Sequence, residues 1–299
     1  MRRFFKYIEI TTKITSTFAF FMTVAFLLYR KEAIDWGLTS IFFSSMLIFD
    51  FTTTAINNYI DSRDNSQTLP YERKTALIII WLLFFISVFL GLYLVYLTDL
   101  VVLLLGGICF LCGVFYTYGP VPISRQPLGE FLSGIFYGLF IPSILLYINM
   151  PEGTFLTLHL SLKLIALQIK VIPMLTLLLI SIIPSCTTAN IMLANNICDL
   201  EKDIAVKRHT LPYYIGKKAL YLFAGLYYLC YLAVIIMTAF RILSPLCLLS
   251  LITIIPVQKN INIFFKKQDK LSTFILSVKN YVIIMGSVTL LLFLSILAD

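Results

Sequence analysis

The sequence predicts an all-α integral membrane protein, a bundle of about nine transmembrane helices with a cytoplasmic N-terminus. The chain of 299 residues is 60% hydrophobic and 13% charged, about half the charged fraction of an ordinary soluble domain. The apolar residues form continuous runs rather than the alternating pattern of a membrane-spanning β-strand. Several runs approach the length of about twenty residues that a helix needs to cross a bilayer.

Nine apolar segments are candidates for the spanning helices. The first follows the basic start MRRFFK and resembles a signal peptide, but it has no convincing small-residue cleavage site. We therefore expect it to remain as the first helix. The eighth is the weakest candidate, because it is short and contains Pro245 and Pro256. In chain order the candidates are 14–29, 37–56, 76–97, 99–116, 130–149, 171–192, 219–239, 243–257 and 276–297.

Lysine and arginine are distributed unequally over the connections, and this asymmetry predicts the orientation of the bundle. With a cytoplasmic N-terminus, the outer side keeps Arg30, Lys31, Lys163, Lys170 and Arg241. The cytoplasmic side carries Arg2, Arg3, Lys6, Lys13, Arg63, Arg73, Lys74, Arg125, Lys202, Lys207, Arg208, Lys217, Lys218, Lys259, Lys266, Lys267, Lys270 and Lys279. Most of the net charge of +8 therefore reflects membrane topology and not nucleic-acid binding.

A single transmembrane domain that covers residues 1–299 is expected, because no connection is long enough to separate two domains. The long outer connection, 150–170, is moderately apolar and is expected to lie along the outer membrane surface. Histidine- or cysteine-based chemistry is not expected. The only histidines are His159 and His209, and the six cysteines lie mostly in apolar runs.

Two polar clusters follow apolar segments that are expected to end at the same membrane face. They are NNYIDSRDN at 57–65 and NNICDLEKD at 195–203. In helical conformation, residues spaced by three, four or seven positions share one face. This spacing joins Asp50, Asn57, Asp61 and Asp64 in the first cluster, and Asn195, Asp199 and Asp203 in the second. Two such faces in one bundle can meet.

Facing carboxylates in a cavity of low dielectric repel one another unless cations lie between them. Carboxylate and amide oxygens suit Mg²⁺, which often bridges to substrate phosphates. Four cations, Arg63, Lys202, Lys207 and Arg208, lie beside the acids and could bind phosphate. Polar residues at helix ends often act only as caps, but two copies of one pattern on one side disfavour that interpretation. For Asp50 both a functional and a helix-packing role stay open.

Three stretches resemble the UbiA superfamily of intramembrane prenyltransferases, and within it the 1,4-dihydroxy-2-naphthoate prenyltransferases of menaquinone synthesis. They are NNYIDSRD at 57–64, YTYGPVPISRQPLGEFLSG at 116–134 and NNICDLEKDIAVKRHTLPYYIG at 195–216. The two aspartate motifs are specific for the superfamily, whereas the GPxP…PLGE loop points to the naphthoate branch. The resemblance in helix number and topology extends along nearly the whole chain.

The resemblance implies a UbiA-like bundle that transfers a polyprenyl group from its diphosphate to 1,4-dihydroxy-2-naphthoate. The ring loses carbon dioxide, and the product is demethylmenaquinol. The implied cofactor is Mg²⁺, and the implied partners are the polyprenyl diphosphate, the aromatic acceptor and the lipid bilayer, without nucleic acid. The implied location is the cell membrane, as a multi-pass protein whose active site opens toward the cytoplasm.

The resemblance also implies roles for individual residues. The implied metal ligands are Asn57, Asp61, Asp64, Asn195, Asp199 and Asp203. The implied catalytic residues are Asp61, Arg63, Asp199 and Asp203. The substrate-binding set is Tyr116, Tyr118, Arg125, Lys202, Lys207 and Arg208. For Arg125, which would bind the naphthoate carboxylate or the diphosphate, an ordinary role as a cytoplasmic loop cation stays open.

Three positions depart from the superfamily pattern. Asn58 stands where an aspartate is usual, and Cys198 stands where an arginine is frequent. Asp64 follows Asp61 by three residues instead of four or more, and Asn65 holds the four-residue position. Either Asp64 or Asn65 is therefore the expected ligand.

Two other functions stay open. A different acceptor within the superfamily, such as 4-hydroxybenzoate, haem, a chlorophyll precursor or a lipid glycerol, would use the same machinery. A cation-coupled transporter would bind a cation between the acidic helices, but polar or broken helices would then be expected on the outer side as well. The concentration of acids at the cytoplasmic face favours the enzyme.

Overall fold

The computed structural model describes residues 2–64, 68–119, 122–161 and 163–298. Within these ranges, nine helices are long and apolar enough to cross a membrane, and each overlaps one predicted segment. The prediction of an all-α membrane protein is thus confirmed. The spans are Ile10–Tyr29, Trp36–Ser62, Arg73–Leu97, Leu100–Thr117, Gly129–Asn149, Val171–Cys198, Lys218–Ala239, Pro245–Lys266 and Ile275–Ala298.

The chain folds into two compact units, which are described separately. The first unit comprises Met1–Thr17 and Ile34–Ile123, and the second comprises Phe18–Ala33 and Ser124–Asp299. The helix α2 (Ile14–Tyr29) begins in the first unit and continues in the second. The expectation of one domain over residues 1–299 stays a prediction.

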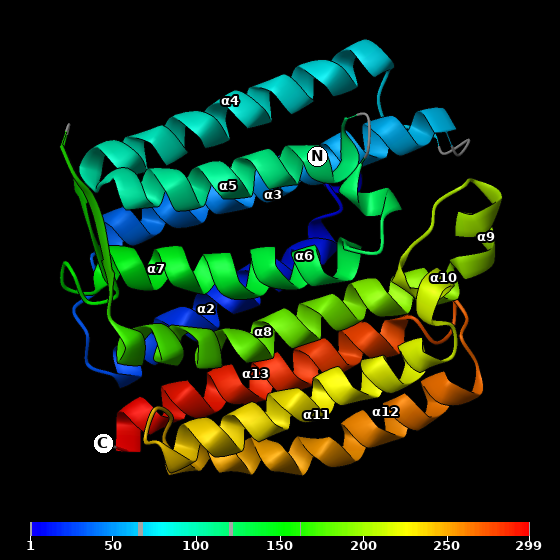
Figure 1. The fold of residues 1–299 in the computed structure, drawn as a ribbon. Coiled ribbons are helices and arrows are strands. Elements are labelled where there is room, and N and C mark those ends of the chain that lie inside the picture. Colours follow the sequence, from blue (N-terminus) through cyan, green and yellow to red (C-terminus); the bar gives the residue numbers. More distant parts are fainter. Residues whose placement is uncertain (1, 65–67, 120–121, 162, 299) are drawn as a thin grey trace. The chain divides into compact units, whose positions relative to one another are not determined.

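Three long helices form the body of the first unit. Figure 1 shows α3 (Trp36–Asp64), α4 (Arg73–Leu97) and α5 (Leu100–Thr117) side by side. The helix α5 begins where it does because the Asp99 side chain accepts hydrogen bonds from two backbone amides of its first turn. The outer face of α4 is apolar and exposed, as a helix in contact with lipid requires.

A short N-terminal segment, α1 (Arg2–Tyr7), is fixed to this body. The Tyr7 side chain is fully buried, and its hydroxyl donates to the carbonyl of Ala76 at 3.4 Å. The Asn58 side-chain amide donates to the Tyr7 carbonyl at 2.9 Å. Asn58 is a departure from the superfamily pattern, and this bond gives it a structural role, because an ionised aspartate has no proton to donate.

A buried ion pair lies between the 3-10 helix η1 (Ile10–Lys13) and α3. The Lys13 ammonium contacts Asp50 Oδ1 at 2.8 Å and also donates to the Thr54 hydroxyl. Ser16 donates to the other Asp50 oxygen at 2.7 Å. Lys13 is only 4% exposed, and its predicted place on the cytoplasmic side stays a prediction. These contacts favour the helix-packing role of Asp50.

Replacing Asp50 by Asn should therefore destabilise the protein by about 3–5 kcal/mol, because the Lys13 ammonium is left buried beside a neutral amide. The double variant Lys13→Met/Asp50→Leu should lose less than the sum of the two single variants, because it leaves no buried charge. Thermal unfolding of the purified protein in detergent measures all three. An unchanged melting temperature for Asp50→Asn would contradict this role.

The second unit is built around the long helix α8 (Val171–Cys198). Figure 1 shows α11 (Lys218–Ala239) and α13 (Ile275–Ala298) packed along it. One span consists of α6 (Gly129–Ile135), the π-helix η3 (Phe136–Phe140) and α7 (Ile141–Asn149). Shorter elements are the 3-10 helix η2 (Ile123–Arg125), at the unit boundary, α9 (Leu200–Ala205) and α10 (Leu211–Ile215).

The eighth span is longer than predicted. It joins a 3-10 helix, η4 (Pro245–Thr253), to α12 (Ile254–Lys266). Pro245 opens η4 and Pro256 lies in the first turn of α12, where a missing backbone N–H breaks no helical hydrogen bond. The prolines therefore mark the starts of two helical segments and do not end the span.

The connection 150–170 contains the strands β1 (Leu156–Leu160) and β2 (Ile165–Ile169), which Figure 1 shows as two green arrows. They pair antiparallel, with Leu156 opposite Ile169. No strand was predicted in this connection, because two segments of five residues give only a weak alternating pattern. Its placement along the outer surface stays a prediction.

Candidate active site

The first polar cluster lies at the end of α3. Asn57 Oδ1 accepts a hydrogen bond from the Thr117 hydroxyl, at the last residue of α5, over 3.3 Å. Asp61 is half-buried on the same helix. The side chains of Arg63 and Asp64 lie outside the described part of the structure, and so does Asn65. The choice between Asp64 and Asn65 therefore stays as predicted.

The second cluster lies where α8 passes into α9. Asp199 leaves helical geometry (φ −98°, ψ 7°), and α9 begins at the next residue, turned away from the axis of α8 in Figure 1. Backbone hydrogen bonds still link Asp199 to Asn195 at 3.0 Å and Asp203 to Asp199 at 2.9 Å. The helix α8 therefore ends just before Asp199, but i→i−4 hydrogen bonding continues to Asp203, and the shared face of Asn195, Asp199 and Asp203 stays a prediction. The contacts of the cluster fall into two groups, one around Asp199 and one around Asp203.

The first group binds a cation. The Lys270 ammonium contacts Asp199 Oδ2 at 2.5 Å and also donates to Asn195 Oδ1. Lys270 precedes α13 and was not predicted as a site residue. The sequence indicates only that Lys270 lies in a connection on the same predicted side of the membrane as the cluster. Asn195 and Asp199 are thus brought together as predicted.

The second group is more deeply buried. The guanidinium of Arg208 lies 3.6 Å from Asp203 Oδ1, and its Nε donates to the carbonyl of Ser124 at 2.8 Å. Burial raises the pKa of Asp203, and the positive charge of Arg208 opposes that shift. Arg208 therefore links the end of the second cluster to the loop that precedes α6.

Glu130 joins this group and was missed as a site residue. Its Oε1 accepts a hydrogen bond at 2.8 Å from the side-chain amide of Asn196, the second residue of the NN motif. Both side chains are buried, at 4% and 1% exposure. In the described part of the structure, Glu130 Oε2 and Asp203 Oδ2 are buried without a hydrogen-bond partner. Glu130 thus fixes the start of α6 to the cluster-bearing end of α8.

The other predicted binding residues are less buried than Asp203. Lys202 and Lys207 are exposed, and Lys207 has a positive φ of 57°. Arg125 is exposed as well. Tyr116 is half-buried in α5, and Tyr118, which follows α5, is 63% exposed.

Whether these residues suit Mg²⁺ is decided by their donor atoms. No three His, Cys, Asp or Glu side chains converge in the ranges that the structure describes. The oxygens of Asn195 and Asp199 nevertheless already bind one cation, the Lys270 ammonium. Amide and carboxylate oxygens are hard ligands, and Asp203 keeps a buried oxygen without a partner in the described residues. The second cluster therefore fits a magnesium ion.

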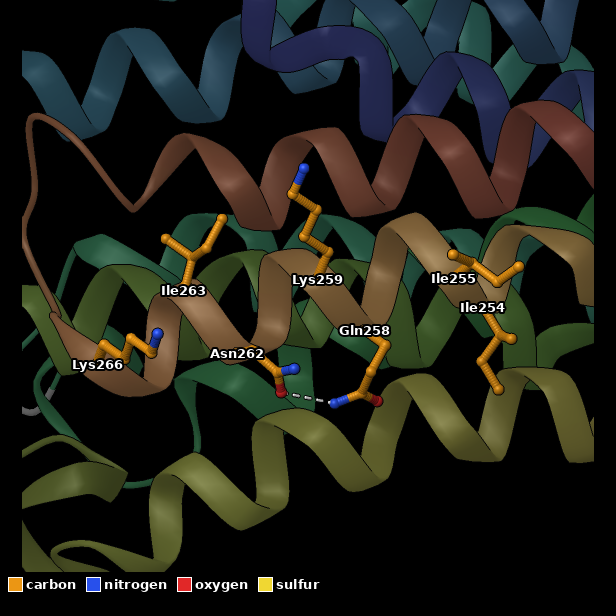
Figure 2. A pocket seen from close by; sticks show the side chains of 7 residues that line it. All are labelled: Ile254, Ile255, Gln258, Lys259, Asn262, Ile263 and Lys266. Carbon is orange, nitrogen blue, oxygen red and sulfur yellow. Dashed lines mark hydrogen bonds between the residues drawn. The ribbon is translucent and has the colours of Figure 1, made fainter.

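A cavity of about 700 Å³ opens along α12, and none of the predicted site residues lines it. Gln258 accepts a hydrogen bond from the Tyr228 hydroxyl at 2.6 Å and donates to Asn262 at 2.8 Å. Figure 2 shows the side chains of Gln258 and Asn262 on the side of α12 that faces α11. The lining residues are Ile254, Ile255, Gln258, Lys259, Asn262, Ile263 and Lys266.

In the described residues, nine apolar helices with polar clusters at two helix ends define a multi-pass membrane protein that carries carboxylate and amide groups at helix termini. The model of the UbiA prenyltransferase family matches residues 18–274. The chain belongs to this family.

Individual relatives agree with this assignment. The 1,4-dihydroxy-2-naphthoate octaprenyltransferase of Bacillus subtilis is 27% identical over 226 residues, which are 71% of this chain and 66% of that protein, just under two thirds. A UbiA homolog from Aeropyrum pernix K1 shares the fold with a TM-score of 0.66 at 16% identity, over 93% and 98% of the two chains. A UbiA homolog from Archaeoglobus fulgidus, solved with GPP and Mg²⁺, shares the fold with a TM-score of 0.61 at 13% identity, over 98% of this chain and 99% of that chain.

Proposed function

We propose that the protein transfers a polyprenyl group from polyprenyl diphosphate to 1,4-dihydroxy-2-naphthoate, with loss of carbon dioxide, to give demethylmenaquinol. The observation that carries the proposal is that Asn195 and Asp199 of the NNxxD motif together bind a positive charge, the Lys270 ammonium. The family and the function of the Bacillus relative support the reaction class and the acceptor. The GPP and Mg²⁺ bound to the Archaeoglobus homolog support the donor and the metal.

In this proposal, the carbon–oxygen bond at C1 of the prenyl chain breaks, and its electron pair leaves with the diphosphate. Bound Mg²⁺ would supply charge neutralisation for that departure. The residues that would hold it are Asn57, Asp61, Asp64, Asn195, Asp199 and Asp203. The residues that would bind phosphate oxygens are Arg63, Lys202, Lys207 and Arg208. The ring carbon that carries the carboxylate then donates the electron pair of the new carbon–carbon bond. The electron pair of the ring–carboxylate bond returns to the ring as carbon dioxide leaves.

The acceptor side of the site is assigned to the 116–130 loop. Tyr116 and Tyr118 would shield the allylic cation from water, since aromatic faces stabilise positive charge. Arg125 would bind the carboxylate of the acceptor. Glu130 would act as a positioning residue, because its hydrogen bond to Asn196 fixes the end of α8 that carries the second motif.

The proposed setting is the cell membrane, with the N-terminus and the site on the cytoplasmic side. The lysine and arginine distribution supports this orientation. The prenyl tail would lie between helices and leave sideways into lipid. A transfer reaction between a lipid-soluble donor and a polar acceptor requires access to both phases at one membrane face.

The test uses membranes that contain the protein, Mg²⁺, labelled farnesyl diphosphate and 1,4-dihydroxy-2-naphthoate. We expect a labelled, decarboxylated prenyl naphthoquinol that depends on the divalent cation. A parallel reaction with 4-hydroxybenzoate distinguishes the acceptors. Product with hydroxybenzoate alone would refute the naphthoate assignment, and the absence of product with any aromatic acceptor would refute aromatic prenyl transfer.

A further inference from the structure

Lys270 occupies the two oxygen atoms that the second motif offers to a metal. Its ammonium lies 2.5 Å from Asp199 Oδ2 and also contacts Asn195 Oδ1. These side chains are one helical turn apart at the end of α8, and both were predicted as metal ligands. The Lys270 side chain is 36% exposed, so it has room to move away from them.

The turn that carries Lys270 is held by its own hydrogen bonds. The Asp269 carboxylate accepts from the backbone amide of Ser272 at 2.8 Å and from its hydroxyl at 2.5 Å. The Asp269 amide donates to the Thr273 hydroxyl at 2.8 Å. None of these bonds involves the Lys270 side chain. The ammonium can therefore leave Asn195 and Asp199 without unfolding the turn.

The ammonium and a divalent cation exclude each other at these oxygens. Magnesium binds its oxygen ligands at about 2.0–2.1 Å, and an ammonium at hydrogen-bond distance from the same two atoms would lie against it. Their charges also repel. A divalent cation that takes both oxygens must displace Lys270. The displaced ammonium is then available to bind an anion, and its turn keeps it within side-chain reach of Asn195 and Asp199.

We propose that Lys270 competes with the divalent cation for Asn195 and Asp199, and that the displaced ammonium binds a phosphate oxygen of the diphosphate. The second half of this proposal rests on the proposed function, which supplies the diphosphate. Lys270 is then a substrate-binding residue that couples two events. The metal binds weakly while the ammonium has no other anion, and it binds more tightly when the diphosphate is present to receive the ammonium.

The experiment measures Mn²⁺ binding to the purified full-length protein by electron paramagnetic resonance, with and without inorganic pyrophosphate. For Lys270→Met we expect Mn²⁺ alone to bind about two- to fivefold more tightly, the value of one partly exposed ion pair. The increase in Mn²⁺ affinity caused by pyrophosphate should be smaller than in the unmodified protein. The matched control is Lys266→Met, which removes an exposed lysine of α12 (Figure 2) and should change neither quantity.

Each outcome separates one part of the proposal. Equal or weaker Mn²⁺ binding by Lys270→Met overturns the competition. Tighter Mn²⁺ binding with an unchanged pyrophosphate effect overturns the phosphate contact. Asp199→Asn should abolish Mn²⁺ binding both in the unmodified protein and in Lys270→Met. Mn²⁺ binding that persists in Asp199→Asn would also overturn the competition. Because no acceptor is present, a failure of prenyl transfer to naphthoate leaves the expected Mn²⁺ result unchanged.

Discussion

Replacing Asp199 by Asn is expected to lower the rate of prenyl transfer by about 10²–10³-fold or more, while the helices stay folded. The side chain keeps its size and one oxygen acceptor, so the packing at the end of α8 is preserved. It loses the negative charge that now binds the Lys270 ammonium at 2.5 Å and that would hold Mg²⁺ against the departing diphosphate. Asp61→Asn is expected to have the same effect in the first motif.

Initial rates in membranes, together with the melting temperature of the purified protein, distinguish lost chemistry from lost folding. The matched control is Glu201→Gln, because Glu201 is an exposed acid two residues after Asp199. It should keep both the rate and the melting temperature. Near wild-type rates in Asp199→Asn and Asp61→Asn would show that the two aspartates do not bind a required metal.

Hydropathy and charge were enough to predict the nine spans, because a bilayer imposes length and apolarity on each helix independently of its neighbours. Asn195 and Asp199 were predicted together for a similar local reason, since a spacing of four residues defines one helical face. Asp203 lies in the next helix, α9, because α8 ends just before Asp199. No proline or glycine marks that break in NNICDLEKD.

Contacts between distant segments could not be predicted in this way. Glu130 bonds to Asn196 and Lys270 bonds to Asp199 across more than sixty residues, and neither pair has a spacing rule. Lys13 was assigned to the cytoplasmic side without a partner because the positive-inside rule counts charges and does not consider what they contact. Its partner, Asp50, lies in a different helix, and only the packed structure brings their side chains to 2.8 Å.

Gly138→Ala is expected to destabilise the second unit by about 3 kcal/mol, at the upper end of the usual cost of overpacking. A Cβ atom added at Gly138 would lie 2.1 Å from the backbone nitrogen of Ser185 and 2.3 Å from its Cα. A Cβ atom added at Gly134, one turn earlier, would lie 2.8 Å from the Ser185 carbonyl oxygen. Small residues at this spacing let two helices approach closely in a membrane, where apolar burial gives little driving force. The contact holds the span that begins at Gly129 against α8.

The clash involves backbone atoms, and this distinguishes the prediction from a simple loss of side-chain space. Ser185→Gly removes only the hydroxymethyl group, so the double variant Gly138→Ala/Ser185→Gly should remain destabilised. Gly225→Ala is the matched control, because it adds the same methyl group to a helix of the same unit where no atom lies within 4 Å. That control should be neutral or gain up to about 1 kcal/mol from helix propensity. Melting temperatures in detergent should fall by about 6–12 °C for Gly138→Ala, if each kcal/mol shifts them by about 2–4 °C. If Gly138→Ala melted together with Gly225→Ala, the close contact between η3 and α8 would not contribute to stability.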